Sequence, residues 1–344
     1  MNIEHLVAKY DSENQFAVIS NSHSQILNTW ETPIDTSAID VSRIKNIVVS
    51  GLGGSAIGGD LIADFTNGEL SIPYSVNRNY GLPKFVNSDS LVIASSYSGN
   101  TEETMSAAEE AVKRGSQVVA VTTGGKLEKF AKENNIPLFI MKGGLQPRYA
   151  LYSNFFALLK VLQTLNLIDD QDKIVKNISN LIEAKSKEYQ LDKSLPYNLA
   201  ENLVGSIPII YGVSGVTSTL AVRLKGEINE NSKLHAFYNF LPEMNHNEII
   251  GWETYDEAQF RTKVILFKDK SYHPQIQKRI EISKGLINKA GAEIIELESK
   301  EKALKSRLFD LIYLGDWISY YLALIRKQDP TEIDNIIFLK ENLK

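Results

Sequence analysis

The stretch "SGLGGSAIGGD", residues 50–60, decides the fold class of this chain. It directly follows the apolar, β-branched run at residues 47–49. A buried strand that leads through a glycine-rich turn into a helix brings backbone N–H groups close to a bound anion. Two anions fit such a loop: the pyrophosphate of a dinucleotide, or the single phosphate of a small sugar. The stretch therefore predicts an α/β fold, and the rest of the chain must identify the anion.

Strand-like runs alternate with helix-like segments on both sides of the middle of the chain. The expected strands are 46–50, 72–76, 91–96, 117–123 and 136–141, then 207–212, 234–240, 263–268 and 292–298. The expected helices between and after them are 57–66, 101–114, 125–134, 274–290 and 302–326, with residues 151–190 mainly helical. This alternation predicts parallel sheets covered by helices on both faces.

The two halves of the chain share a local layout. "KNIVVSGLGGS" and "PIIYGVSGVTS" both read as a strand, a small-residue turn and a helix start, which indicates a weak internal repeat. We therefore expect two similar α/β domains. The expected divisions are a helical N-terminal arm (1–40), a first domain (41–165), a linker or helical connection rich in Lys, Asp, Asn and Ser (166–195), and a second domain (196–344).

Composition excludes several classes of protein. With 344 residues, 43% of them hydrophobic and 23% charged, the chain can build an ordinary globular core. A net charge of −5 disfavours nucleic acid and anionic membranes as partners, and the absence of cysteine excludes disulfides, thiolate catalysis and Cys-ligated metals. The polar N-terminus lacks a signal-like apolar segment, and we expect no stretch long enough to span a bilayer. A cytoplasmic location is expected.

A dinucleotide remains one candidate for the anion. Gly51, Gly53 and Ala56 fit the G-x-G-x-x-G/A pattern. That pattern also needs an acidic residue at the end of the second strand to hold the ribose hydroxyls. Here the second strand runs into "NRN" at 77–79, and its Arg78 would suit a 2′-phosphate. The hypothesis of an NADP-dependent oxidoreductase is therefore weakened, but it stays open.

A second loop favours a phosphate monoester. In "SSYSGNTEET", residues 95–104, three hydroxyls follow a buried strand: Ser96, Ser98 and Thr101. Gly99 permits a left-handed turn, and Thr101 stands at the expected N-cap of the next helix. Hydroxyls and free N–H groups at a helix N-terminus bind phosphate without a permanent cation. This arrangement suits a ligand that must bind and leave.

The two loops together resemble the sugar isomerase (SIS) fold, which binds phosphosugars with such serine and threonine loops. Four more motifs extend the similarity: "PRYAL" (147–151), "EINENSK" (227–233), "PEMNHNEIIGW" (242–252) and "IIFLKENL" (336–343). From about residue 40 to its C-terminus, the chain resembles the bifunctional phosphoglucose/phosphomannose isomerase family. The resemblance implies two SIS domains. It also implies metal-independent interconversion of glucose 6-phosphate, and of mannose 6-phosphate, with fructose 6-phosphate through a cis-enediol(ate), without a cofactor.

The resemblance also assigns roles to individual residues. Glu230 matches the proton-transferring carboxylate and His246 the ring-opening histidine. Arg148 would stabilise the enediolate charge, since a guanidinium keeps its proton, and Lys340 would lie near the ring oxygen and O1. The implied phosphate ligands are Gly54, Ser55, Ser96, Ser98 and Thr101.

The same resemblance implies a homodimer in which His246 reaches the pocket of the neighbouring subunit, although the residues alone leave open whether it acts within its own subunit. Glu227 departs from the family pattern one helical turn before Glu230, so the roles of these two glutamates are open to confusion.

Two rival interpretations remain. A non-catalytic phosphosugar-binding SIS regulator would use the same loops, but it has no need of the four catalytic-type residues together. A metal site would draw on Glu243, His246 and Glu248. A lone E-x-x-H without a second copy or another nearby histidine disfavours it.

Overall fold

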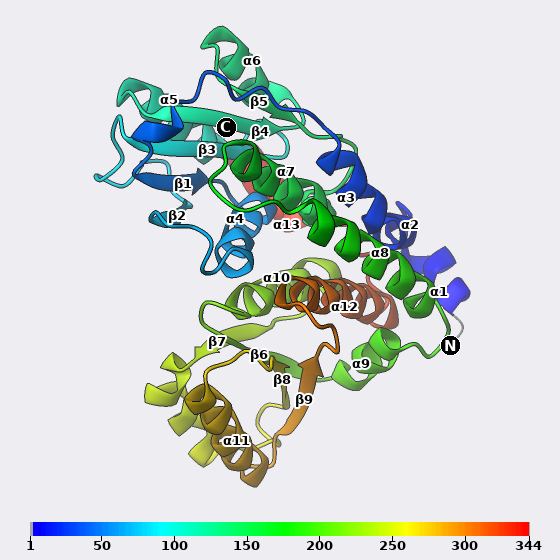
Figure 1. The fold of residues 1–344 in the computed structure, drawn as a ribbon. Helices are drawn as coiled ribbons and strands as arrows, with labels where there is room; N and C mark the ends of the chain where they lie inside the picture. Colours follow the sequence, from blue (N-terminus) through cyan, green and yellow to red (C-terminus); the bar gives the residue numbers. More distant parts are fainter. Residues whose placement is uncertain (1–2, 344) are drawn as a thin grey trace. The chain divides into compact units, whose positions relative to one another are not determined.

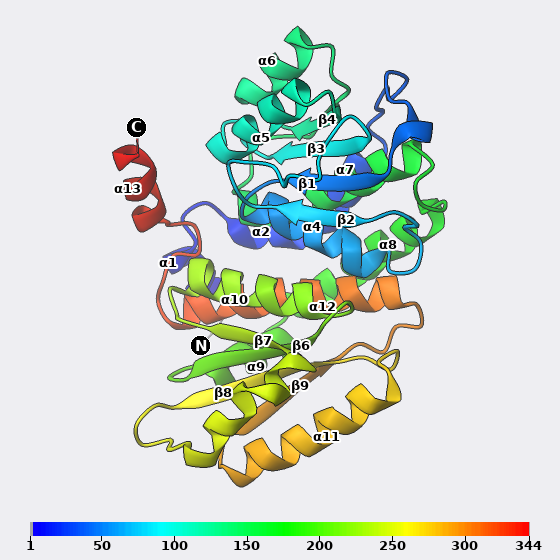
Figure 2. The same cartoon turned by 90° about the vertical axis from the view of Figure 1, so that its left-hand side faces the viewer.

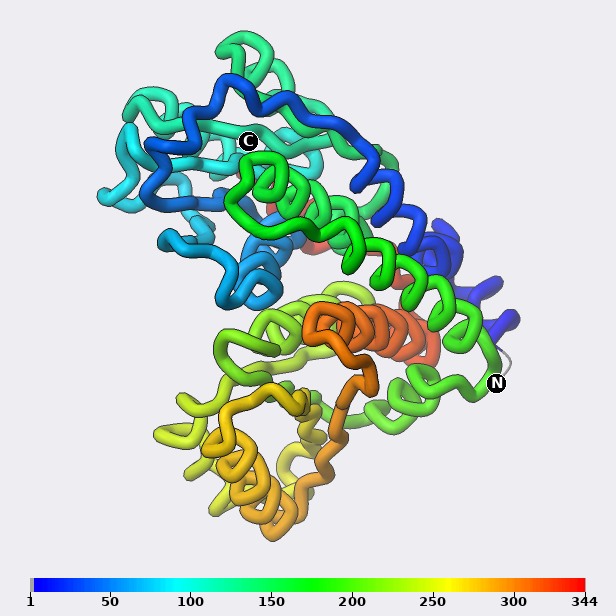
Figure 3. The backbone as a smooth tube through the Cα atoms, viewed as in Figure 1, coloured from blue at the N-terminus to red at the C-terminus, as the bar shows by residue number. Residues whose placement is uncertain are grey.

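The computed structural model describes residues 3–343, and the chain divides into two compact units. We call Ser22–Asn180 the first-sheet unit, and Met1–Asn21 together with Leu181–Lys344 the second-sheet unit. The backbone trace of Figure 3 shows the chain entering the first-sheet unit in dark blue and leaving it in green. These units group the chain differently from the expected ranges, because the first helices belong with the C-terminal half.

The first-sheet unit holds a five-stranded parallel sheet in the order β2-β1-β3-β4-β5 (Figure 1). Its strands are β1 Asn46–Ser50, β2 Tyr74–Asn77, β3 Ser90–Ser96, β4 Gln117–Thr122 and β5 Leu138–Ile140. Its helices are α3 Ser22–Trp30, η1 Val41–Arg43, α4 Gly54–Phe65, α5 Glu102–Lys113, α6 Gly125–Glu133, η2 Pro147–Ala150 and α7 Leu151–Thr164. Helix α8, Asp172–Tyr189, continues across the boundary into the second-sheet unit.

Burial on both faces explains why these strands read as continuous apolar runs. All seven residues of β3 are buried, as expected for a central parallel strand covered by helices. Helices α5 and α6 pack on one face, where their alanines and Leu127 meet Ala94 and Ala120 of the sheet. On the other face Gly59 of α4 lies against Val49. The predicted α/β architecture is confirmed.

The second-sheet unit repeats this topology. Its parallel order β7-β6-β8-β9 matches the first four strands of the other sheet position by position. The strands are β6 Ile207–Val213, β7 Phe237–Leu241, β8 Thr262–Lys268 and β9 Glu293–Glu298. Its helices are α1 Ile3–Tyr10, α2 Gln15–Ser20, α9 Leu195–Leu203, α10 Ser218–Ser232, η3 Glu243–His246, η4 Glu248–Thr254, α11 Pro274–Lys289, α12 Leu304–Ile325 and α13 Asp334–Asn342. The predicted internal repeat is confirmed.

The two faces of the second sheet carry different elements. Figures 1 and 2 show α10 and α12 on one face and α11 on the other. Right-handed crossovers require this arrangement, because β7 and β8 lie on opposite sides of β6. Tyr211 of β6 belongs to the core on the α11 face, together with Met244 of η3 and Trp252 of η4. The segment that follows β7 therefore covers the face opposite to α10.

The N-terminal residues are helical, as predicted, but they are built into the units. Leu6 of α1 and Ile19 of α2 are buried, and Tyr313 of α12 donates a hydrogen bond of 3.1 Å to the Ile19 carbonyl oxygen. Ile26 of α3 is buried in the first-sheet unit. The expected arm is thus divided between the two cores.

One helix contradicts the expectation that no segment is long enough for a bilayer. Among residues 3–343, α12 alone has the length and apolar composition to cross a membrane, with 22 residues. However, 89% of its most apolar window is buried inside the protein. It has the burial of a core helix, in which apolar residues on all sides meet other protein elements.

Candidate functional site

The first glycine loop joins β1 to α4 at the carboxyl edge of the first sheet. Gly53 adopts φ +52°, a left-handed backbone that favours glycine, and as the N-cap of α4 it offers no side chain to the helix. A Cβ added to Gly51 would lie 2.9 Å from the Ser95 carbonyl oxygen, so this loop presses against the second one. Ser55 follows in the first turn of α4 and is buried. The N-terminus of α4 therefore begins without a cap from the Gly53 position, and a helix start of this kind can bind an anion.

The second loop joins β3 to α5 at the same edge. Thr101 stands at the predicted N-cap of α5, but its side chain makes no capping bond there. Its Oγ1 lies 2.8 Å from Oγ of buried Ser96 instead. Ser98 is exposed, and its Oγ accepts a hydrogen bond from the Asn100 N–H at 3.3 Å. The predicted hydroxyls are therefore gathered beside the uncapped start of α5.

Gly99 allows the second loop to lie close to the start of α6. Gly99 has φ +67°, and a Cβ there would lie 1.8 Å from the Gly124 carbonyl oxygen. The N–H of Leu127 donates to the Gly99 carbonyl at 2.9 Å, and the N–H of Lys126 donates to Asn100 Oδ1 at 3.2 Å. The first turn of α6 thus holds the loop in place, while α4 and α5 begin without side-chain caps.

Arg148 lies beside the first loop. It belongs to η2, it is 5% exposed, and its guanidinium carbon lies 5.2 Å from the centre of the Tyr149 ring. A Cβ on Gly54 would lie 2.9 Å from the Pro147 carbonyl oxygen, so the Arg148 turn packs directly on the N-terminus of α4. The turn that carries this permanent cation therefore lies beside the neutral donors of the first loop, a combination that suits a phosphate and a developing negative charge.

A residue that sequence reasoning missed supports the second loop from behind. Asn154 of α7 is buried and donates from Nδ2 to Ser95 Oγ at 2.7 Å. A Cβ on Gly58 of α4 would lie only 2.2 Å from Asn154 Oδ1. Asn154 thus links α7 to the end of β3 and to α4, the elements that flank the two loops. An asparagine in an apolar helix pattern was the one sequence signal that marks it.

The cation on which the NADP hypothesis depends has another role. Arg78, after β2, forms an ion pair with Asp60 of α4. Burial raises the pKa of Asp60, and Arg78 opposes that shift. The Arg78 guanidinium therefore stabilises a partly buried carboxylate of its own unit, which weakens its assignment to a 2′-phosphate.

Glu230 lies in the last turns of α10, in the second-sheet unit. It is partly buried and lines a pocket of about 460 Å³. The other lining residues are Asn229, Lys233, Gln328, Glu332, Ile333, Asp334, Asn335 and Ile336. The volume falls in the usual range for small-molecule sites. A carboxylate that lines a polar pocket is the type of group that can exchange protons with a ligand.

His246 ends η3 on the opposite face of the second sheet. The preceding Asn245 donates from Nδ2 to Ser283 Oγ of α11 at 2.8 Å. The following Glu248 accepts hydrogen bonds from Tyr211 OH at 2.6 Å and from Asn239 Nδ2 at 2.5 Å. These bonds fasten the His246 segment to the α11 face, whereas α10 carries Glu230 on the other face.

The hydrogen bonds of Glu248 also bear on the metal hypothesis. Its two carboxylate oxygens are directed at donors on β6 and β7. Within residues 3–343 there is no group of three or more His, Asp or Glu side chains placed to hold a metal ion. The hydrogen bonds of Glu248 instead hold this loop to β6 and β7.

Lys340 is exposed on α13, a helix without a buried residue. Phe338 and Leu339 beside it are 64% and 60% exposed. Neither Lys340 nor His246 is among the described residues that line the Glu230 pocket. One chain therefore gathers the predicted phosphate ligands with Arg148, and it leaves the other three catalytic candidates on separate surfaces of the second-sheet unit.

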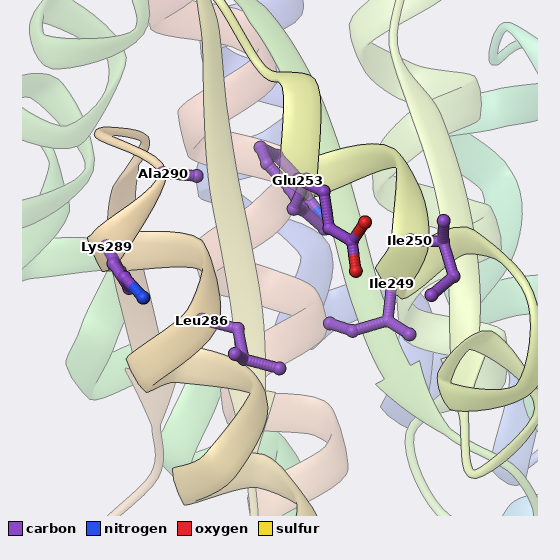
Figure 4. A pocket seen from close by; sticks show the side chains of 7 residues that line it. Ile249, Ile250, Glu253, Leu286, Lys289 and Ala290 are labelled. Carbon is purple, nitrogen blue, oxygen red and sulfur yellow. The ribbon is translucent and has the colours of Figure 1, made fainter.

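A second hollow of about 370 Å³ lies between η4 and α11 (Figure 4). Its lining is mostly aliphatic and contains none of the predicted site residues: Ile249, Ile250, Trp252, Glu253, Leu286, Lys289 and Ala290. Figure 4 shows the Glu253 carboxylate and the Lys289 ammonium at its sides. It lacks the clustered donors that a phosphosugar needs.

Comparison with known proteins identifies the family. Residues 192–343 match the bacterial phospho-glucose isomerase C-terminal SIS domain. The chain is 41% identical to a bifunctional phosphoglucose/phosphomannose isomerase of Caldicellulosiruptor bescii, covering 95% of this chain and 98% of the relative. It is 35% identical to the protein of the same name from Aquifex aeolicus, covering 96% and 99%.

A solved structure agrees in fold. A putative phosphosugar isomerase of Clostridium difficile superposes with a TM-score of 0.67 at 15% identity, covering 99% of this chain and 98% of that one. At this identity the likeness concerns the fold alone. Together with the two relatives above, it confirms the predicted SIS architecture. The chain belongs to the bifunctional phosphoglucose/phosphomannose isomerase family.

Proposed function

We propose that this protein interconverts glucose 6-phosphate, and mannose 6-phosphate, with fructose 6-phosphate. The observation that carries the proposal is the meeting of two uncapped helix starts, the Ser96–Thr101 hydroxyl pair and buried Arg148 at one sheet edge. Family membership supports the same activity. The substrate is a phosphosugar, and we place the enzyme in the cytoplasm.

The phosphate loops hold the substrate while the proton moves. Gly54, Ser55, Ser96, Ser98 and Thr101 bind the 6-phosphate through N–H and hydroxyl donors. Binding energy from this remote group orients carbons 1 and 2 for reaction. Because the donors are neutral, product release does not require separation of an ion pair.

The proton transfer needs one carboxylate and one permanent cation. Glu230 removes the proton from C2 of the open-chain aldose and returns it to C1, so the carboxylate is regenerated in each turnover. Arg148 stabilises the negative charge on the enediolate oxygens. His246 opens the ring by moving a proton to the ring oxygen, and Lys340 holds the ring oxygen and O1.

A single base serves both aldoses. Glucose 6-phosphate and mannose 6-phosphate differ in configuration at C2, and this carbon becomes planar in the enediolate. Rotation about the C2–C3 bond presents either face to Glu230.

We further propose a homodimer in which each pocket receives His246 from the partner. The support is the placement of the two side chains within one subunit. Glu230 stands on the α10 face of the second sheet, and the His246 segment is bonded to the α11 face through Ser283 and Tyr211. A sheet with its packed core lies between them, so a second copy is the simplest source of the histidine.

A subunit-mixing experiment tests this arrangement. Glu230→Gln and His246→Asn homodimers are each expected to be inactive. When equal amounts are unfolded and refolded together, half of the dimers are mixed and each has one intact pocket, so about a quarter of wild-type activity returns. No recovery, with mixed dimers demonstrated by two affinity tags, would place His246 in the pocket of its own subunit.

The activity itself is tested with protein treated with a chelator. It is expected to convert fructose 6-phosphate into both glucose 6-phosphate and mannose 6-phosphate, and to exchange the C2 proton with solvent. Tight sugar-phosphate binding without turnover or exchange would favour the regulator. Fluorescence enhancement of NADPH on mixing with the protein would revive the oxidoreductase.

A further inference from the structure

Three charged side chains lie together inside the second-sheet unit, between α10 and α12. Arg223 Nη2 is 2.6 Å from Glu227 Oε1 and 2.7 Å from Asp316 Oδ1, and Arg223 Nε is 3.2 Å from the same Asp316 oxygen. We call these residues the Arg223 cluster. Their exposed fractions are 6%, 3% and 3%. Two carboxylates and one guanidinium would leave a net negative charge in the interior, which is costly unless a proton is added.

The hydrogen bonds locate that proton. Asp316 Oδ1 accepts from both Nε and Nη2 of Arg223, so Asp316 is the principal counter-ion of this guanidinium. Both oxygens of Glu227 are buried, and neither has an aligned donor among the described residues. The same guanidinium nitrogen, Arg223 Nη2, lies against one oxygen of each carboxyl group. Two buried carboxyl groups that share one guanidinium carry one negative charge too many unless one of them is protonated.

The electrostatic environment of Glu227 agrees with this assignment. Burial raises its pKa well above the usual value, and Arg223 opposes the shift. The negative charges of Asp316 on α12 and of Glu230 on α10 raise the pKa further. Glu227 thus holds its proton under conditions in which an exposed glutamate would have lost it.

The cluster lies one helical turn from Glu230, because residues three apart share a helix face. Beyond it, Asn231 Nδ2 donates to Ser319 Oγ at 2.9 Å, and Ser232 Oγ donates to the Ser319 carbonyl at 2.7 Å. The last turns of α10 are therefore fastened to α12 on both sides of Glu230. These contacts form a polar seam between α10 and α12.

We propose that Glu227 is a positioning residue carried as a neutral carboxylic acid beside the Arg223–Asp316 ion pair, which keeps the Arg223 cluster free of net charge. Glu230 then lies beside a neutral group, on a turn that the seam fastens to α12. A neutral Glu227 places no second negative charge one helical turn from the proposed base. The inference rests on the proposed role of Glu230, while the protonation of the cluster can be tested separately.

Infrared difference spectroscopy tests the protonation directly. The wild-type protein at neutral pH is expected to show the carbonyl stretch of a buried carboxylic acid, and Glu227→Gln is expected to lose it. Asp316→Asn is expected to lose it as well, because Glu227 then becomes the counter-ion of Arg223 and releases its proton. An unchanged band in Glu227→Gln, or no such band in the wild type, overturns the assignment. Neither result depends on catalysis.

Kinetics test the positioning role. Glu227→Gln keeps a neutral group of the same shape, so kcat and KM should stay within about threefold and the acidic limb of kcat/KM should not move. Glu227→Ala should lower kcat per folded molecule more than it changes KM, because the Glu230 turn loses one of its contacts with the polar seam between α10 and α12. A shift of the acidic limb to lower pH in Glu227→Gln would show that Glu227 is ionised in the wild type. An unchanged kcat in Glu227→Ala would refute the positioning role.

A matched control comes from another buried pair of the same unit. Arg307 Nε lies 2.5 Å from Asp269 Oδ2, and both residues are buried. Asp269→Asn should lower the Tm while leaving kcat per folded molecule and the acidic limb unchanged. If Glu230→Gln retained turnover, the proposed function of Glu230 would fail, and the infrared result would still decide the state of Glu227.

Discussion

Glu230→Gln is expected to lower kcat for fructose 6-phosphate by about 10²–10⁴-fold, with little change in KM. Glutamine keeps the shape of the side chain, so the pocket still binds substrate, but an amide can neither take the C2 proton nor return it. Steady-state turnover measures the loss. Solvent exchange of the C2 proton, followed by NMR in deuterated water, should fall with it.

Glu332→Gln is the matched control, because Glu332 lines the same pocket. It removes one negative charge without removing the proposed base, so its kcat should be close to wild type. Equal losses of kcat in the two variants would mean that catalysis depends on the total negative charge of the pocket and not on one particular base. Near-normal turnover in Glu230→Gln would remove Glu230 from its proposed role.

Gly99→Ala should be the most damaging single substitution in the phosphate loops. Its Cβ would lie 1.8 Å from the Gly124 carbonyl oxygen, and alanine at φ +67° is itself strained. The loop must shift, and it would carry the Ser96–Thr101 hydroxyl pair with it. We expect kcat/KM to fall by about 10²-fold, mostly through KM, and stability to fall by about 1–3 kcal/mol.

Gly68→Ala is the control that separates the effect of backbone strain from the effect of the steric clash at Gly99. Gly68 has φ +87°, but a Cβ there meets no heavy atom within 4 Å. It should cost about 1 kcal/mol of stability and leave KM for fructose 6-phosphate unchanged. Thermal unfolding and steady-state kinetics on both variants make the comparison. An unchanged KM in Gly99→Ala would show that this loop does not bind the phosphate.

The carboxyl end of the first sheet shows how far local sequence information reaches. An apolar run followed by small and hydroxyl residues specifies a strand, a tight turn and a helix start over about a dozen residues. The positions of Gly53, Gly99 and Thr101 could therefore be predicted. The use of the Thr101 hydroxyl could not, because its partner Ser96 becomes available only when the loop closes over the end of the strand.

The buried polar residues of the second-sheet unit show what local sequence information cannot predict. The sequence marks Glu227 only as a departure from the family pattern. Arg223 and Asp316, which meet beside it, are 93 residues apart in the chain, and Asp316 lies in an otherwise apolar helix. That helix also has the length and apolar composition of a membrane span, and its burial among other elements of the protein marks it as a core helix. Neither periodicity nor spacing reports which buried charges will meet, because that depends on which helices pack together.

The sequence by itself determined two repeated parallel α/β sheets, the phosphate-type loops and the chemical identity of the candidate residues. These features follow from periodicity, turn chemistry and residue type, which act over short stretches of chain. Only the tertiary structure decided that Glu230 and His246 occupy opposite faces of one sheet, that Arg78 is held by Asp60, and that Glu227 faces a second carboxyl group. Each of these depends on packing between distant segments, and long-range packing has no local signal in the sequence.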